Sequence, residues 1–204
     1  MKTPLSSTAL LLCSIIFLQS CATSSISRTQ RKADIVNSKE TASGCFVQLN
    51  DGTIKHYNSL KLVTSPITSP YLLADGKTRI KAKQITAYQN RDHYAISQKT
   101  FFGGRLSYVA TETLPGFAVR TVKGKINVYC KKYYNGQVAL NEYFLQAGDN
   151  GKIIPYTPNL LNELVKDNSE AASFFNSKKY KGSSTEKLHA TAHLYNNAQL
   201  ISKN

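Results

Sequence analysis

The residues of this 204-residue chain that could carry out chemistry are few and lie far apart in the sequence. His189 and His193 stand four positions apart in a segment with helical periodicity, so one face of a helix would present both imidazoles. That spacing suits two zinc ligands, as in the H-E-x-x-H motif. Here Ala190 replaces the glutamate and no third ligand stands nearby in the sequence. We therefore interpret the pair as surface histidines and predict neither a metal site nor a cofactor.

Carboxylates and nucleophiles form no recognisable catalytic pattern. Three aspartates stand beside or near turn glycines, where capping of backbone N–H groups accounts for them: Asp51, Asp75 and Asp149. Glu112 and Glu142 lie in strand-like segments, and folding could bring either of them to His56 or His93, which leaves an acid–base pair open. The sequence contains no G-x-S-x-G nucleophile motif and no glycine-rich phosphate loop between a strand and a helix.

Positive charge is the strongest compositional feature, with 26 Lys and Arg against 12 Asp and Glu, a formal net charge of +14. One stretch has a regular pattern, in which Arg79, Lys81 and Lys83 alternate with smaller or apolar residues. Such alternation places three cations on one face of a strand. The stripe could contact an anionic surface, and the simpler interpretation is the solvated face of an amphipathic strand.

The N-terminus is typical of an exported protein. Lys2 precedes an apolar run at residues 9–18, which is shorter than the roughly 20 residues that span a bilayer as a helix. The tetrapeptide Leu18-Gln19-Ser20-Cys21 resembles the lipobox of bacterial lipoproteins. The resemblance implies a signal peptide at residues 1–20, cleavage before Cys21, and a diacylglycerol on its sulfur. The alternative is an ordinary cleaved signal that leaves Cys21 as a free thiol.

A polar segment at residues 21–42 then reads as a flexible tether between the lipid and a folded domain. No Asp follows Cys21, which by resemblance to sorted lipoproteins favours the outer membrane facing the periplasm. Loss of Lys2 with the signal would lower the net charge by one, from +14 to +13. Export argues against nucleic acid as a partner, so we expect the membrane and anionic envelope components instead.

The remaining cysteines suggest a disulfide. If Cys13 leaves with the signal and Cys21 carries lipid, Cys45 and Cys130 form an even pair in a compartment that permits disulfides. We predict a bridge between these two residues. The alternative is two separate buried thiols.

Turn sequences and periodicity predict an α+β fold. Asp51-Gly52, Asp75-Gly76 and Asn135-Gly136 separate runs typical of strands, and eight to ten strands are expected in a β-rich domain at residues 43–155. We expect an antiparallel sheet or a partly open barrel. A small helical segment follows at residues 156–204.

Two sequence features predict how these helices begin. Thr157 is a suitable N-cap, because Pro158 after it fits the first helical position. Ser183 and Glu186 have the spacing of a capping box.

Residues 80–195 also carry a pattern of turn glycines and aromatic strands. It includes Ile85-Thr86-Ala87-Tyr88, then Phe117 with a Val122–Tyr129 hairpin segment, Tyr143-Phe144-Leu145, and a helical tail ending in Tyr195-Asn196. This pattern is similar to a group of exported domains of unknown function common in Bacteroidetes-type bacteria. The resemblance implies a β-rich fold and an envelope location, and it carries over no catalytic residue.

The sequence thus favours a non-catalytic, membrane-anchored lipoprotein of the bacterial cell envelope that acts as a structural or binding module. The alternative is a periplasmic hydrolase with a site assembled from distant residues. A cleft that gathers Glu112 or Glu142 with His56 or His93 would favour the hydrolase.

Overall fold

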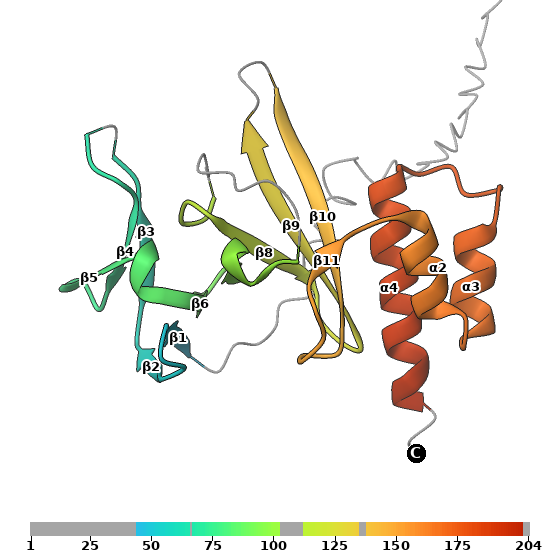
Figure 1. The fold of residues 1–204 in the computed structure, drawn as a ribbon, viewed down its shortest axis with the longest axis horizontal. Coiled ribbons are helices and arrows are strands. Elements are labelled where there is room, and N and C mark those ends of the chain that lie inside the picture. The colour runs from blue at the N-terminus through green and yellow to red at the C-terminus, as the bar shows by residue number, and fades with distance from the viewer. Residues whose placement is uncertain (1–43, 66, 103–111, 135–137, 202–204) are drawn as a thin grey trace, which may run out of the picture.

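A computed structural model describes residues 44–65, 67–102, 112–134 and 138–201. In these residues the chain forms eleven strands and then three α-helices (Figure 1). The strands are β1 (Cys45–Leu49), β2 (Ile54–Tyr57), β3 (Leu60–Val63), β4 (Tyr71–Ala74), β5 (Thr78–Lys81), β6 (Ile85–Gln89), β7 (Tyr94–Ser97), β8 (Phe117–Val122), β9 (Ile126–Tyr134), β10 (Ala139–Ala147) and β11 (Ile154–Pro155). Two 3₁₀ turns, η1 (Ala82–Gln84) and η2 (Gln98–Thr100), follow β5 and β7, and the helices are α2 (Pro158–Val165), α3 (Ser169–Asn176) and α4 (Ser184–Ile201).

The strands form a large sheet of eight strands, in the order β11-β10-β9-β8-β7-β6-β1-β2, and a small sheet in the order β3-β4-β5. Every pair of neighbouring strands is antiparallel. The large sheet ends in β2 at one side and β11 at the other, so it does not close. The predicted α+β fold with an open antiparallel sheet and a C-terminal helical segment is confirmed.

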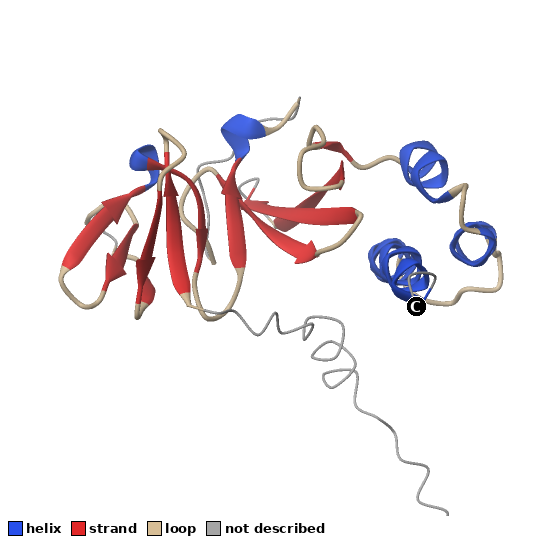
Figure 2. Ribbon diagram, turned by 90° about the horizontal axis from the view of Figure 1, so that it is seen from below, coloured by secondary structure: helices blue, strands red, loops and turns tan. Residues whose placement is uncertain are grey.

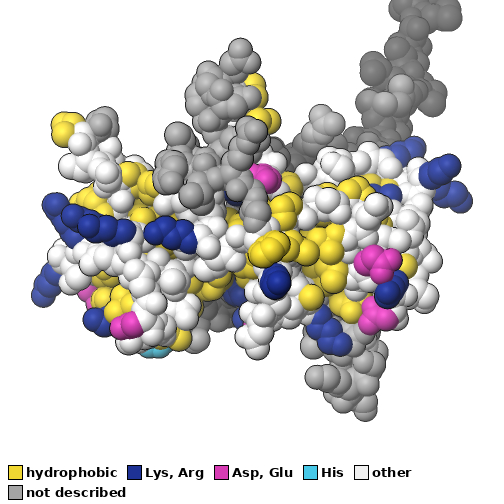
Figure 3. Space-filling view, in the orientation of Figure 1, with side chains coloured by type: hydrophobic (Ala, Val, Ile, Leu, Met, Phe, Trp, Pro, Cys, Tyr) yellow, Lys and Arg dark blue, Asp and Glu magenta, His cyan; other side chains and the backbone are white. Residues whose placement is uncertain are grey.

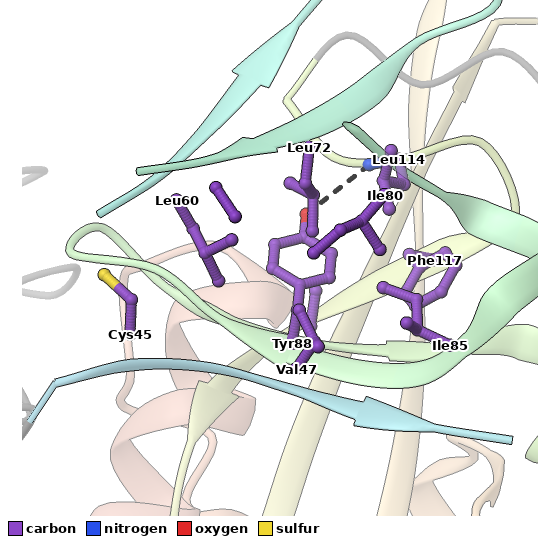
Figure 4. Close-up of a cluster of buried hydrophobic side chains, with 11 residues drawn as sticks. Cys45, Val47, Leu60, Leu72, Ile80, Ile85, Tyr88, Leu114 and Phe117 are labelled. Carbon is purple, nitrogen blue, oxygen red and sulfur yellow. Dashed lines mark hydrogen bonds between the residues drawn. The ribbon is translucent and has the colours of Figure 1, made fainter. Parts of the chain in front are cut away.

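The small sheet packs against one end of the large sheet around Tyr88. Leu60, Leu72 and Ile80, one from each small strand, surround the buried Tyr88 ring (Figure 4). The Tyr88 hydroxyl accepts a hydrogen bond from the backbone N–H of Leu114 at 3.4 Å. Full burial of an aliphatic side chain contributes about 1.5–3 kcal/mol, so these three contacts hold the small sheet in place.

The three helices cover the other end of the large sheet. Figure 2 shows them as a separate layer beside the strands, and α4 lies against β8 and β9. Leu161 of α2, Ala171 of α3 and Leu188 of α4 are buried in a second cluster with Val128 and Leu145 of the sheet. A third, smaller cluster contains Ala118, Tyr129, Phe144 and Ile153.

Both predicted helix caps are confirmed. The Thr157 hydroxyl accepts a hydrogen bond from the Leu160 N–H at 3.1 Å, with Pro158 in the first helical position. The Ser183 hydroxyl accepts from the Glu186 N–H at 3.1 Å, and the Glu186 carboxylate accepts from the Ser183 N–H at 2.8 Å. Each cap satisfies backbone donors that have no partner inside the helix.

The predicted Cys45–Cys130 disulfide is wrong for this structure, because both residues are free, buried thiols. Cys45 lies in β1 and Cys130 in β9, with β6, β7 and β8 between them. Four steps between neighbouring strands separate the two cysteines by roughly 19 Å, whereas a disulfide needs Cα atoms within about 7 Å.

Several predictions fall on residues that the structure does not describe. They include the signal peptide, Cys21, the whole tether at residues 21–42, and the turn at Asn135-Gly136. None of the helices in the described part of the chain combines the length and the apolar character needed to cross a membrane.

Candidate anion-binding groove

The three cations of the predicted stripe line one groove. Arg79 and Lys81 come from β5 and Lys83 from η1, and Lys99 of η2 joins them on the same groove. The groove has a volume of about 880 Å³. Figure 3 shows a row of Lys and Arg side chains on this face of the molecule, at its left, where Figure 1 has the small sheet.

Burial of Ile80 explains why Arg79 and Lys81 point into the groove. Ile80 is buried in the Tyr88 cluster, and successive side chains of a strand point to opposite faces, so both neighbours face outward. Tyr71 of β4 lies opposite Lys81 in the β4–β5 register. The Arg79 guanidinium stacks over the Tyr71 ring, 4.9 Å from its centroid.

A short turn places Lys83 on the groove. The predicted strand is interrupted after Lys81, because the Gln84 side chain accepts a hydrogen bond from the Lys81 N–H at 2.7 Å and closes η1. The Asn50 side-chain amide donates to the Lys83 carbonyl at 2.8 Å, which ties the turn to the β1–β2 loop. Lys83 is therefore held beside Lys81 although it has left the strand.

Long-range contacts of the neighbouring Gln98 hold Lys99 at the groove. The Gln98 N–H donates to the Gly116 carbonyl at 2.8 Å, and the Gln98 side-chain amide donates to the Phe117 carbonyl at 3.2 Å. Gly116 has a φ of +78°, a conformation that glycine adopts without strain. These contacts fix η2 against the segment that enters β8.

The rest of the groove is largely apolar, and none of its lining residues in the described part of the chain is acidic. Its other lining residues are Thr68, Ser69, Pro70, Tyr71, Ala82, Ser97, Pro115, Gly116 and Phe117. Within the described residues, none of the four cations forms an ion pair with a carboxylate. The groove therefore combines unneutralised positive charge with apolar walls, which suits an anion that carries a ring or an aliphatic part.

The carboxylates considered for catalysis are engaged elsewhere. Glu112 forms an ion pair with Lys132, and Glu142 forms one with the buried Lys131. Neither glutamate lines the groove.

The two histidines considered with them also lie outside the groove. The His93 Nε2 lies 3.1 Å from the Tyr88 hydroxyl, and burial lowers the pKa of His93 although Asp92 and Glu112 oppose that shift. The His56 ring packs near Phe46, with 6.0 Å between the ring centroids. Among the four residues, Glu112 and His93 interact electrostatically, and the Glu112 carboxylate acts to raise the pKa of His93.

The prediction that His189 lies at the surface is wrong, because this residue of α4 is buried against the sheet. Its Nε2 lies 2.9 Å from the Thr121 hydroxyl, and its ring packs edge-on against Tyr143. Burial, with a smaller contribution from His193, lowers the pKa of His189 to about 4. Nowhere in the described ranges do three or more His, Cys, Asp or Glu side chains cluster as metal ligands would.

Sequence reasoning missed Lys99 and Tyr71 as groove residues. No local pattern in the sequence joins either residue to the stripe of Arg79, Lys81 and Lys83. The register of β4 with β5 brings Tyr71 to the groove, and the contacts of Gln98 bring Lys99.

Comparisons with known proteins return no matching family model, no similar curated protein and no similar solved structure. The resemblance to exported Bacteroidetes-type domains therefore stays a prediction. The groove is the feature from which a function can be proposed.

Proposed function

We propose that this protein is a non-catalytic lipoprotein of the bacterial cell envelope, anchored through Cys21, whose basic groove binds an anionic envelope component. The observation that carries the proposal is the convergence of Arg79, Lys81, Lys83 and Lys99 on one groove, whose lining within the described ranges includes no acidic residue. The lipobox resemblance supports the anchor, and we place the protein at the outer membrane facing the periplasm.

The groove should attract anions more strongly than an average basic surface. Four like charges on its walls repel one another, and a bound phosphate, sulfate or carboxylate group would relieve that repulsion. Phe117 and Pro115 on the wall exclude water from part of the groove, which strengthens the attraction at short range. Arg79 is already oriented by Tyr71 and loses less side-chain freedom on binding.

The test compares two variants that remove the same charge. Both are made in the full chain carrying Cys21→Ala, which removes the lipid. The groove variant is Lys81→Ser, Lys83→Ser and Lys99→Ser, and the control is Lys178→Ser, Lys179→Ser and Lys181→Ser, three lysines that are exposed away from the groove. We measure the affinity for dextran sulfate, with neutral dextran as the uncharged reference.

We expect the groove variant to bind dextran sulfate about tenfold more weakly, which corresponds to about 1.4 kcal/mol, and the control to stay within about twofold. Neutral dextran should not bind to any of these proteins. An equal loss in the two variants would mean that only the net charge of the protein matters, and the proposal would be wrong.

A further inference from the structure

Among the large hydrophobic side chains of the described residues, Ile67 is the most exposed. Its exposed fraction is 91%, against 66% for Phe102, 53% for Ile54 and 52% for Val138. A single exposed aliphatic residue is ordinary on a protein surface. The position of Ile67 beside the groove is what makes it informative.

Ile67 lies in the loop between β3 and β4, directly before three groove residues, Thr68, Ser69 and Pro70. Figure 1 shows this loop projecting beyond the body of the sheet. The Ile67 N–H donates to the Ser65 hydroxyl at 3.2 Å, so the backbone at the tip is turned by a local hydrogen bond. An apolar tip thus stands at the rim of a groove whose walls carry four cations.

We propose that this face of the protein docks on an anionic phospholipid membrane. Ile67 enters the boundary between head groups and acyl chains, while Arg79, Lys81, Lys83 and Lys99 contact lipid phosphates. The inference rests on the proposed anion binding and names the anion as the head-group layer of a bilayer.

The combination of apolar tip and cations favours a bilayer over a soluble anionic polymer. A polysaccharide could neutralise the cations, but it would leave Ile67 in water, whereas a membrane offers phosphates and an apolar layer a few ångströms apart. Basic residues are attracted to an anionic membrane surface, and the attraction falls off within a Debye length. Both kinds of contact therefore have to lie on one face.

A second exposed apolar side chain, Phe102, comes three residues after Lys99 of the groove. Phe102 follows η2 by two residues, and the Lys152 ammonium lies 4.9 Å from the centroid of its ring. An exposed aromatic ring next to a lysine is typical of surfaces that sit in a membrane interface.

The chain that precedes the described residues is long enough to allow this contact. Residues 22–43, fully extended, reach at most about 75 Å, which exceeds the diameter of a small domain. A lipid on Cys21 would keep the groove close to the bilayer. The groove would then meet the membrane at a high effective concentration, so a weak second contact would be enough to bind it. The two attachments together would orient the domain on the membrane.

The test separates the apolar contact from the charges. In the Cys21→Ala full chain we introduce Ile67→Ser, and as a matched control Ile54→Ser on edge strand β2, which does not line the groove. Sedimentation measures binding to vesicles of 30% phosphatidylglycerol in phosphatidylcholine and to vesicles of phosphatidylcholine alone. The affinity for dextran sulfate in solution is measured as for the groove variant. Because Ile67 is almost fully exposed, its replacement removes no packing from the fold.

We expect Ile67→Ser to weaken binding to the anionic vesicles about tenfold and to leave dextran sulfate binding within about twofold. Ile54→Ser should match the parent on both ligands. The groove variant should lose affinity for both, and phosphatidylcholine vesicles should bind weakly throughout.

The outcomes distinguish this inference from the proposed function. If the parent binds dextran sulfate through the groove lysines but shows no preference for anionic vesicles, or if Ile67→Ser binds them as well as Ile54→Ser does, the membrane-docking inference fails and the anion groove stands. If the groove lysines matter for neither ligand, both proposals fail.

Discussion

Burial of His189 between α4 and β8 makes the stability of this protein depend on pH. The imidazole contacts the Thr121 hydroxyl and the Tyr143 ring, and the half-buried His193 lies one turn further along α4. Burial disfavours the charged form and lowers the pKa of His189 from 6.5 to about 4. The unfolded chain therefore takes up a proton between these two pH values, and the folded chain does not.

We predict that the free energy of unfolding falls as the pH is lowered from about 6.5 towards 4, and that replacement of His189 by Gln reduces this fall. The sign follows from linkage, because stability rises with pH wherever the unfolded state binds more protons. At pH 4.5 the difference between the two proteins, each compared with its own value at pH 7, should be about 2–3 kcal/mol. Urea denaturation at each pH measures it.

His56→Gln is the control, because His56 is exposed on edge strand β2. It should leave the pH dependence of the parent protein unchanged. If His189→Gln loses as much free energy of unfolding at low pH as His56→Gln does, burial of His189 does not contribute to the acid sensitivity of the protein.

At the scale of single residues, the sequence indicated three of the four groove cations as a possible basic stripe, but it did not predict the groove. Arg79, Lys81 and Lys83 were predicted to share a face because alternation is a local property of a strand. Lys99 could not be predicted from the sequence, because hydrogen bonds from Gln98 to residues 116 and 117 bring it to the groove. His189 was misjudged because the helix pattern does not say which face of α4 meets the sheet.

The helical segment shows what a single cap contributes to an element. α2 has eight residues, too few to be stable alone, and its first turn depends on Thr157. We predict that Thr157→Ala lowers the free energy of unfolding by about 1 kcal/mol, because the Leu160 N–H loses its acceptor. Denaturant titration at pH 7 measures the change.

Ser173→Ala serves as the reference for this prediction. Ser173 is exposed in the middle of α3, and its replacement should change the free energy of unfolding by less than about 0.5 kcal/mol. A Thr157→Ala protein as stable as this reference would show that packing alone holds α2.

At the scale of elements, local chemistry was enough for helix starts and tight turns. Thr157 accepts from the N–H of Leu160, and Ser183 and Glu186 bond to each other. Each of these two pairs is three residues apart in the chain, so their roles are visible in the sequence. The interruption of the strand after Lys81 was missed. The cause is partly distant, because Asn50 from another loop helps to hold the turn.

For the molecule as a whole, attachment to the membrane depends on Cys21 in our proposal. We predict that Cys21→Ala abolishes incorporation of labelled palmitate and moves the protein from the detergent phase to the aqueous phase on detergent partition. The expected loss of anchoring is large, because each buried methylene contributes about 0.8 kcal/mol. A Cys45→Ala protein, which keeps Cys21, should stay labelled. Continued labelling of Cys21→Ala would contradict the lipid anchor.

Strand order is the property of the whole molecule that the sequence did not reveal. Turn sequences predict neighbouring strands well, but β1 pairs with β6, some forty residues later in the chain. The insertion of β6, β7 and β8 between β1 and β9 is what separates Cys45 from Cys130. A count of cysteines could not anticipate that distance.

The position of β8 between the hydrophobic clusters has a consequence for how the protein unfolds. Phe117 belongs to the cluster under the small sheet, Ala118 to the smaller cluster, and Val122 to the cluster under the helices. One six-residue strand therefore contributes to all three cores. Melting of any one of them removes support from a strand that the other two need, so the β-rich part and the helices should lose their structure as one cooperative unit.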